Sequence, residues 1–246
     1  MSGVVLAILA SAGLLYVLAA VDLRWSPLRT ASWLAGLAVA AGGLTGPLAA
    51  AHGDLRAHLA AHLLTGMVAP VLLVLAAPVT LLLRALPVRR ARLVSRVLRS
   101  GPARVLGDPF VAVALNVGGL WLLHVSGLLG TVAHSPGGHL LVSVHVLLTG
   151  WLATAAVLAV DPSPHRRGVV ARAVALGAGM AGHDVLAKWL YAHPPDGVTN
   201  AAAGARLLYD GGTVVHVLVA ALLWRQWYRS RAAVRDAELA ARPAPV

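Results

Sequence analysis

Seven long apolar segments, separated by short polar stretches, occupy most of the 246-residue chain. A helix needs roughly 20 apolar residues to cross the hydrocarbon core of a bilayer, and these segments are about that long. No alternation of polar and apolar residues suggests a β-barrel, so the backbone groups must be satisfied within helices. The predicted segments are 3–21, 31–51, 58–83, 110–133, 139–160, 169–192 and 206–224.

The pattern predicts an all-α, polytopic membrane bundle of about seven transmembrane helices. Composition agrees, because charged residues make up 12% of the chain, against about 25% in soluble domains. We assign residues 1–230 to a single transmembrane domain and residues 231–246 to a cytoplasmic tail. The first segment lacks a basic region before it and a small-residue cleavage site, which predicts a retained span and not a signal peptide.

The basic residues give the predicted orientation. All but three of the 20 Lys and Arg residues fall in loops on one side of the bundle, the exceptions being Arg56, Lys188 and Arg206. The positive-inside rule therefore places the N-terminus outside and the C-terminus in the cytoplasm. Basic clusters between apolar runs argue against nucleic-acid binding. The basic stretch 89–104 is predicted to form a short amphipathic helix against anionic lipid headgroups.

The histidines are the candidate chemical groups. With this orientation, every histidine except His165 falls in the outer half of the bundle or in an outer loop. His58 and His62 are one helical turn apart and can bind a single ion. His145 begins another segment at a comparable depth and is a candidate further ligand, and His52 could close over the site from the preceding loop. The chain has no cysteine, and imidazole ligands suit copper, zinc, iron or nickel.

Other polar residues within the segments have two possible roles. His124, His183 and His216 could each be a metal ligand or only make a packing hydrogen bond. Asp184 and Lys188 are four residues apart, which favours a salt bridge between them. The glycine pairs Gly118-Gly119 and Gly211-Gly212 are expected to allow close approach of neighbouring helices.

The segment HLAAHLLTGMVAPVLLVLAAPVTLLLRALP resembles the signature of the CtaG family of caa3-type cytochrome c oxidase assembly proteins. The matching features are the His58/His62 pair, Ala69-Pro70, Ala77-Pro78 and Leu86-Pro87. The helix that ends in Asp161-Pro162 and the last segment, with its glycine pair and Trp-Tyr-Arg cluster, are also similar to the family. The resemblance covers about residues 50–230.

The resemblance implies a multi-pass protein of the bacterial plasma membrane that is needed to mature a haem–copper oxidase. The leading hypothesis is a non-enzymatic assembly factor, without catalytic residues, that binds or delivers copper on the extracytoplasmic side. His58, His62 and His145 are the proposed ligands, with His52 and His216 as candidates and zinc as the alternative metal. The expected partners are cytochrome c oxidase subunits or a copper carrier, together with membrane lipids.

Two alternatives remain open. Three histidines with Asp210 could form a zinc-dependent membrane hydrolase site. His62 and His145 could instead ligate a haem b for electron transfer. Neither alternative explains the proline-spaced signature.

Overall fold

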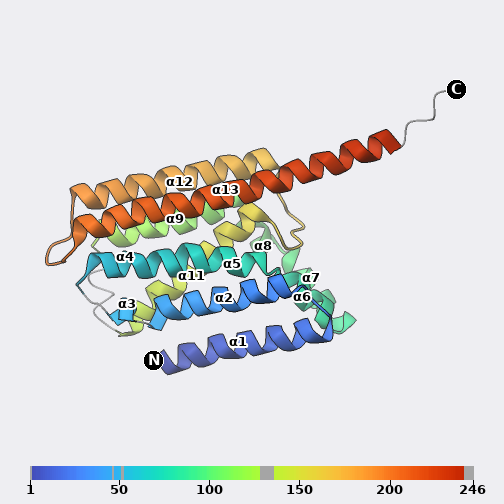
Figure 1. The fold of residues 1–246 in the computed structure, drawn as a ribbon, viewed down its shortest axis with the longest axis horizontal. Helices are drawn as coiled ribbons and strands as arrows, with labels where there is room; N and C mark the ends of the chain where they lie inside the picture. Colours follow the sequence, from blue (N-terminus) through green and yellow to red (C-terminus); the bar gives the residue numbers. More distant parts are fainter. Residues whose placement is uncertain (1, 46, 51–52, 128–135, 241–246) are drawn as a thin grey trace.

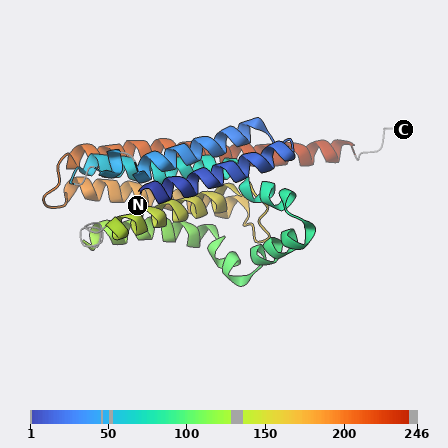
Figure 2. The same cartoon turned by 90° about the horizontal axis from the view of Figure 1, so that it is seen from below.

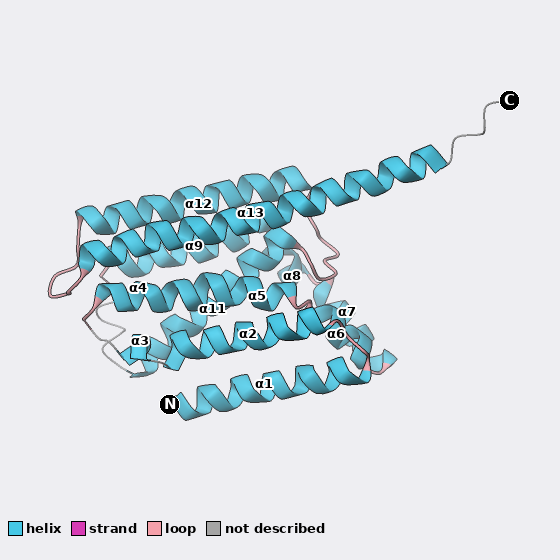
Figure 3. Cartoon of the chain, viewed as in Figure 1, coloured by secondary structure: helices cyan, strands magenta, loops and turns pink. Residues whose placement is uncertain are grey.

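Proline sets the start of many of the helices. The computed structural model describes residues 2–45, 47–50, 53–127 and 136–240, and all its named elements are helices (Figure 3). Helices α2, α3, α6, α9 and α11 each begin at a proline, whose missing N–H costs nothing in a first turn. The elements are α1 Ser2–Asp22, α2 Pro27–Thr45, α3 Pro47–Ala50, α4 Leu55–Leu63, the π-helix η1 Leu64–Val68, α5 Ala69–Leu75, α6 Pro78–Ala85, α7 Val88–Leu98, α8 Gly101–Leu106, α9 Pro109–Val125, α11 Pro136–Leu158, α12 Val169–Ala192 and α13 Ala201–Ala240.

The predicted all-α membrane bundle is confirmed. Each of the seven apolar segments coincides with one or more helices, and 5 helices are long and apolar enough to cross a membrane. These are Gly3–Asp22, Leu55–Leu75, Gly137–Leu158, Val169–Ala192 and Ala201–Ala232. Helix α1 begins and α13 ends at opposite ends of the bundle, and α13 projects well beyond it (Figure 1). The exact number of spans and the compartment that each end faces stay predictions.

The continuous helix α4–η1–α5 occupies the middle of the bundle, between α2 and α13 (Figure 1). It packs on α2, α11 and α13, and α9 lies against α11 and α12. Glycines permit the close contacts. A Cβ on Gly204 of α13 would lie 2.9 Å from the backbone of Leu55 and Arg56 in α4. The central helix is therefore held on several sides by neighbouring backbones.

The third predicted segment is not one helix through residue 83. It stops after α5, because Ala77 adopts a left-handed conformation with φ of 53° and Pro78 starts the separate helix α6. A residue that precedes proline is disfavoured in the right-handed helical region, which explains the break. The family-like Ala77-Pro78 step is thus a turn between two helices.

The basic stretch between α6 and α9 lies at one end of the bundle. Helices α7 and α8 lie at the end away from the α12–α13 loop and fold off the side of the bundle (Figure 2). The basic stretch is helical as predicted, but it forms two helices and not one, and none of the α7 side chains is buried. Its contact with lipid headgroups stays a prediction. Arg172 differs from its neighbours because it is only 3% exposed and donates hydrogen bonds to the Val157 and Leu158 carbonyls. It thereby satisfies carbonyls at the C-terminus of α11, where a cation is favoured.

Candidate metal centre

Five histidines from four helices converge inside the bundle, and we call them the histidine cluster. His58 and His62 come from α4, His124 from α9, His183 from α12 and His216 from α13. Their ring centroids are 5.9 Å apart for His58 and His124, 6.4 Å for His62 and His183, and 5.2 Å for His183 and His216. The α12–α13 loop and the basic helices α7 and α8 lie at opposite ends of the bundle (Figure 1).

Part of the cluster surrounds a small cavity, the outer cavity, of about 30 Å³. Its walls include four imidazoles, those of His58, His62, His124 and His139. A water molecule needs roughly 10–15 Å³ by this kind of measure, so the space admits a water or a metal ion. The predicted pair His58 and His62 therefore faces one cavity, as its spacing required.

The backbone of the central helix widens directly after His62. Pro70 has no N–H to donate to the Gly66 carbonyl four residues earlier, and its ring would clash with that carbonyl in a regular α-helix. The chain forms the π-turn η1 at this point, and the Ala69 N–H reaches back to the Leu64 carbonyl. Such π-bulges occur frequently at functional sites. The proline of the sequence signature thus has a direct effect on the backbone next to His62.

Helix α11 packs closely against the widened turn at two glycines, Gly66 and Gly150. A Cβ on Gly66 would lie 2.7 Å from Val146 Cγ1 and 3.1 Å from His62 Cε1. A Cβ on Gly150 of α11 would overlap the Gly66 carbonyl oxygen. These two glycines therefore let α11 approach the His62 ring closely.

Several ring nitrogens in the cluster are buried without a hydrogen-bond partner. They are His62 Nε2, His124 Nε2, both nitrogens of His183 and His216 Nδ1. An unsatisfied buried polar group costs about 1–3 kcal/mol, so a set of them needs an explanation such as a bound ion. His124 Nδ1 lies 2.9 Å from the Leu120 carbonyl, a geometry in which Nδ1 carries the proton. That tautomer leaves His124 Nε2 with a free lone pair, as a metal ligand requires.

His145 lies outside the outer cavity. Four residues of α11 line it, namely His139, Val142, Ser143 and Val146, which recur on one helical face. His145 is off that face; its side chain is exposed, and its Nε2 would lie 2.6 Å from a Cβ on Gly119 of α9. His145 therefore does not line the cavity that His58 and His62 share, and its role as a ligand stays a prediction. His52 lies outside the described residues.

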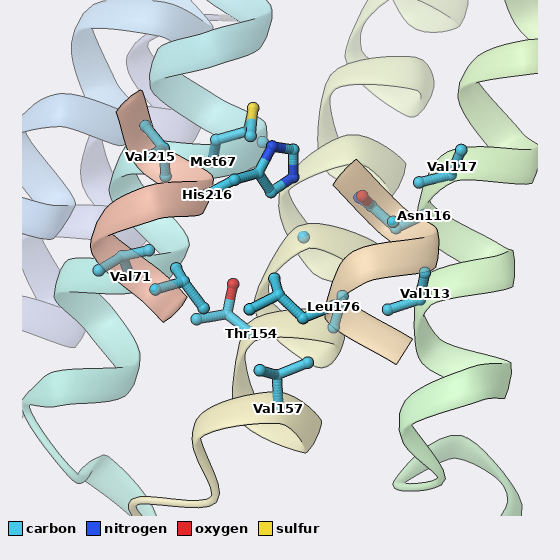
Figure 4. A pocket seen from close by; sticks show the side chains of 15 residues that line it. Met67, Val71, Val113, Asn116, Val117, Thr154, Val157, Leu176, Val215 and His216 are labelled. Carbon is cyan, nitrogen blue, oxygen red and sulfur yellow. The ribbon is translucent and has the colours of Figure 1, made fainter. Parts of the chain in front are cut away.

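His216 lies deeper, where it lines a second cavity of about 60 Å³ (Figure 4). We call this space the inner cavity; its walls are mainly apolar, with Asn116 and Thr154 as further polar residues. Met67, which is part of the π-turn η1, lines the same cavity as His216. His216 thus joins the histidine cluster through His183 and not through the predicted His58/His62 pair.

His183 and Asp184 take a more central position than the sequence indicated. Three ligand atoms, one each from His183, Asp184 and His216, lie within 4.8 Å of one another. The expected salt bridge from Asp184 to Lys188 is absent from the described residues, and the Lys188 ammonium lies 5.2 Å from the centre of the Tyr209 ring instead. Asp210, the carboxylate of the hydrolase alternative, is exposed and is not in this group.

The fold and the cluster define a class: a polytopic helical membrane protein with a buried, imidazole-lined centre. The chain belongs to the family described as cytochrome c oxidase caa3 assembly factor (Caa3_CtaG), whose model matches residues 14–230. The resemblance seen in the proline-spaced segment is thereby confirmed over a longer part of the chain.

Three curated relatives from mycobacteria are similar to the chain, and all are uncharacterized proteins. Those of Mycobacterium bovis and Mycobacterium tuberculosis are each 34% identical over 177 residues, which is 67% of this chain and 26% of the relative. The Mycobacterium leprae protein is 32% identical over 168 residues, 65% of this chain and 25% of the relative. The chain thus spans about a quarter of the length of these relatives. No solved structure matches the chain.

Proposed function

We propose that this chain assists cytochrome c oxidase assembly in a bacterial plasma membrane by holding copper in the outer cavity and passing it to an oxidase subunit. The observation that carries this proposal is the arrangement of His58, His62 and His124 around one small cavity. Two of these residues, His62 and His124, have a buried Nε2 without a partner. Membership of the caa3 assembly factor family supports cytochrome c oxidase as the target, and the imidazole donors support copper as the cargo.

The chemistry of the outer cavity suits a carrier. Imidazole binds copper well, and the chain has no cysteine that would hold the ion more tightly. The described residues that line the cavity include the hydroxyls of Thr65 and Ser143 but no carboxylate to act as a general base. The site can therefore bind and release an ion by ligand exchange, whereas it lacks the acid–base group of a hydrolase.

The position of the cavity favours delivery outside the cytoplasm. Residues of α4 line it, and α4 lies at the end of the bundle opposite the basic helices α7 and α8 (Figure 1). Basic loops mark the cytoplasmic side in the positive-inside rule. An oxidase subunit or a copper carrier at the outer surface would then be the exchange partner.

Copper binding by the purified chain tests the proposal. The protein, solubilised in detergent and stripped of metal, should bind Cu⁺ or Cu²⁺, and His58→Ala with His62→Ala should remove the copper held in the outer cavity. His193→Ala is the matched control, because His193 is an exposed histidine stacked on Trp189. In a deletion strain, the wild-type chain and the control should restore oxidase activity, whereas the double variant should not. Unchanged copper binding and full rescue by the double variant would contradict the proposal.

A further inference from the structure

We infer that His183, Asp184 and His216 form a second cation site, separate from the outer cavity, that takes a divalent first-row transition metal ion. The site is built between α12 and α13, and it shares no residue with the outer cavity. The inference goes beyond the proposed copper carriage, because it stands or falls independently of what the outer cavity binds.

The three donor side chains lie close to a common point. Their ligand atoms lie within 4.8 Å of one another. Donors on one tetrahedral ion lie about 3.4 Å apart, given metal–ligand bonds of about 2.1 Å. The donors would therefore have to draw together by up to about 1.4 Å when an ion binds. Among the described residues, no other group of three His, Asp or Glu residues meets this distance.

Four polar atoms of the three side chains are buried without a hydrogen-bond partner. Both His183 nitrogens, Asp184 Oδ1 and His216 Nδ1 are buried and make no hydrogen bond. His183 is only 2% exposed, so bulk water does not satisfy its ring. A carboxylate inside a membrane bundle is costly without a cation, and the Lys188 ammonium lies over the Tyr209 ring instead of beside Asp184. A divalent ion would satisfy the carboxylate and an imidazole nitrogen of each histidine together.

The His183 ring is held in place from two sides. On one side lies Gly212 of α13, where a Cβ would be 2.7 Å from His183 Nδ1 and closer still to Cε1. On the other side, the His62 ring stacks at 6.4 Å with an interplanar angle of 23°. The space for the ring therefore depends on glycine at position 212. A fixed ring is what a metal ligand needs, because little freedom is lost on binding.

The donor set determines the class of ion. Two imidazoles and one carboxylate include no sulfur, which would have favoured Cu⁺. The same combination ligates Zn²⁺ in catalytic sites and non-haem Fe²⁺ in others. A doubly charged ion also compensates the Asp184 carboxylate within the bundle. The geometry thus points to a divalent ion such as Zn²⁺, Cu²⁺ or Co²⁺.

Cobalt is the probe for this site, because low-coordinate Co²⁺ has visible absorption bands that report its ligands. The metal-free full chain, purified in detergent, should develop these bands when titrated with Co²⁺. Asp184→Asn should weaken Co²⁺ binding at least as much as the roughly 10–100-fold that loss of an outer-shell partner causes. His216→Gln is a second ligand variant, at a half-buried position, and should have the same effect.

Two controls separate this site from the outer cavity. Asp196→Asn changes an exposed carboxylate in the α12–α13 loop and should leave the cobalt bands unchanged. His58→Ala, which leaves the His62 ring beside His183 in place, should weaken copper binding at the outer cavity but preserve the cobalt bands. Absence of cobalt bands in the wild-type chain, or Co²⁺ affinity unchanged in both Asp184→Asn and His216→Gln, would overturn the inference. The copper proposal would still stand if the outer cavity retained its copper.

Discussion

The carboxylate of Asp161 accepts hydrogen bonds from Thr80, 81 residues earlier in the chain. The Thr80 backbone N–H donates at 2.7 Å and its hydroxyl at 2.6 Å, and the Val79 N–H donates to the other carboxylate oxygen at 3.2 Å. These are first-turn groups of α6, which have no partner within their own helix. Two separate pieces of the family-like sequence, Ala77-Pro78 and Asp161-Pro162, are therefore parts of one structural unit.

Asp161→Ala should lower the free energy of unfolding by about 1 kcal/mol, because loss of an N-terminal capping side chain typically costs that much. The measurement is thermal or denaturant unfolding of the purified chain in detergent. Asp22→Ala is the matched control, since Asp22 is an exposed carboxylate at the end of α1. A loss no larger than that of the control would contradict the capping role.

Gly212→Ala should displace the His183 ring, because the added Cβ would lie within 2.7 Å of Nδ1. We expect weaker Co²⁺ binding and a loss of stability of about 1–3 kcal/mol, as for other overpacked sites. Gly177→Ala in α12 is the control, because its Cβ would meet no atom within 4 Å. The prediction fails if both variants bind Co²⁺ as the wild type does.

His145→Ala should keep copper, whereas His124→Ala should lose affinity for it. The reason is that His124 lines the outer cavity and His145 does not. Isothermal titration of each purified variant with copper distinguishes the two outcomes. Loss of copper in His145→Ala, with retention in His124→Ala, would favour the ligand set expected from sequence over the arrangement in the structure.

The sequence was sufficient for those parts of the site that depend on local spacing. His58 and His62 share a cavity because four residues make about one turn, which requires no knowledge of the fold. His183 could not be assigned in the same way, since its neighbours His62 and His216 come from other helices and only tertiary packing brings them together. The placement of His145 outside the outer cavity has a similar origin. Depth along the helix was predictable, but the face of α11 that points into the bundle was not.

The helix breaks and polar pairs also depend partly on local sequence and partly on tertiary packing. The predicted segment 58–83 ran through Pro78, although the chemistry of proline favours a boundary there. The π-turn at Leu64–Val68 was not predicted; it precedes Pro70 and lies against α11. The Asp184–Lys188 pair was a reasonable local expectation that tertiary contacts override. Lys188 finds the Tyr209 ring of α13, and Asp184 is left beside the histidines.

The contribution of Asp54 to the stability of the start of α4 depends on pH. Its carboxylate accepts hydrogen bonds from the Ala57 N–H and the Asn200 amide, and these interactions hold its pKa below the ordinary value of 3.8. A lowered folded-state pKa contributes stability above the ordinary value, and this contribution is lost as the pH falls through the folded-state pKa. Asp54→Asn should therefore be less stable than the wild type at about pH 7, and the difference should vanish at strongly acidic pH.

Melting temperatures of the wild type and Asp54→Asn, measured in one detergent across this pH range, check the sign. Asp196→Asn is the control, because Asp196 is an exposed carboxylate in the neighbouring loop. A difference between wild type and Asp54→Asn that did not change with pH would show that the charge of Asp54 is not responsible.

Gly150→Ala tests whether the close contact between α11 and the π-turn positions the outer cavity. The new Cβ would overlap the Gly66 carbonyl oxygen and lie 2.9 Å from the Gly66 carbonyl carbon, so backbone must move on one side. We expect a loss of about 1–3 kcal/mol in stability, together with weaker copper binding, because His62 lies one turn before Gly66. Gly118→Ala in α9, whose Cβ would meet no atom within 4 Å, should change neither property. If Gly150→Ala lost stability but bound copper normally, the contact would support the fold without shaping the cavity.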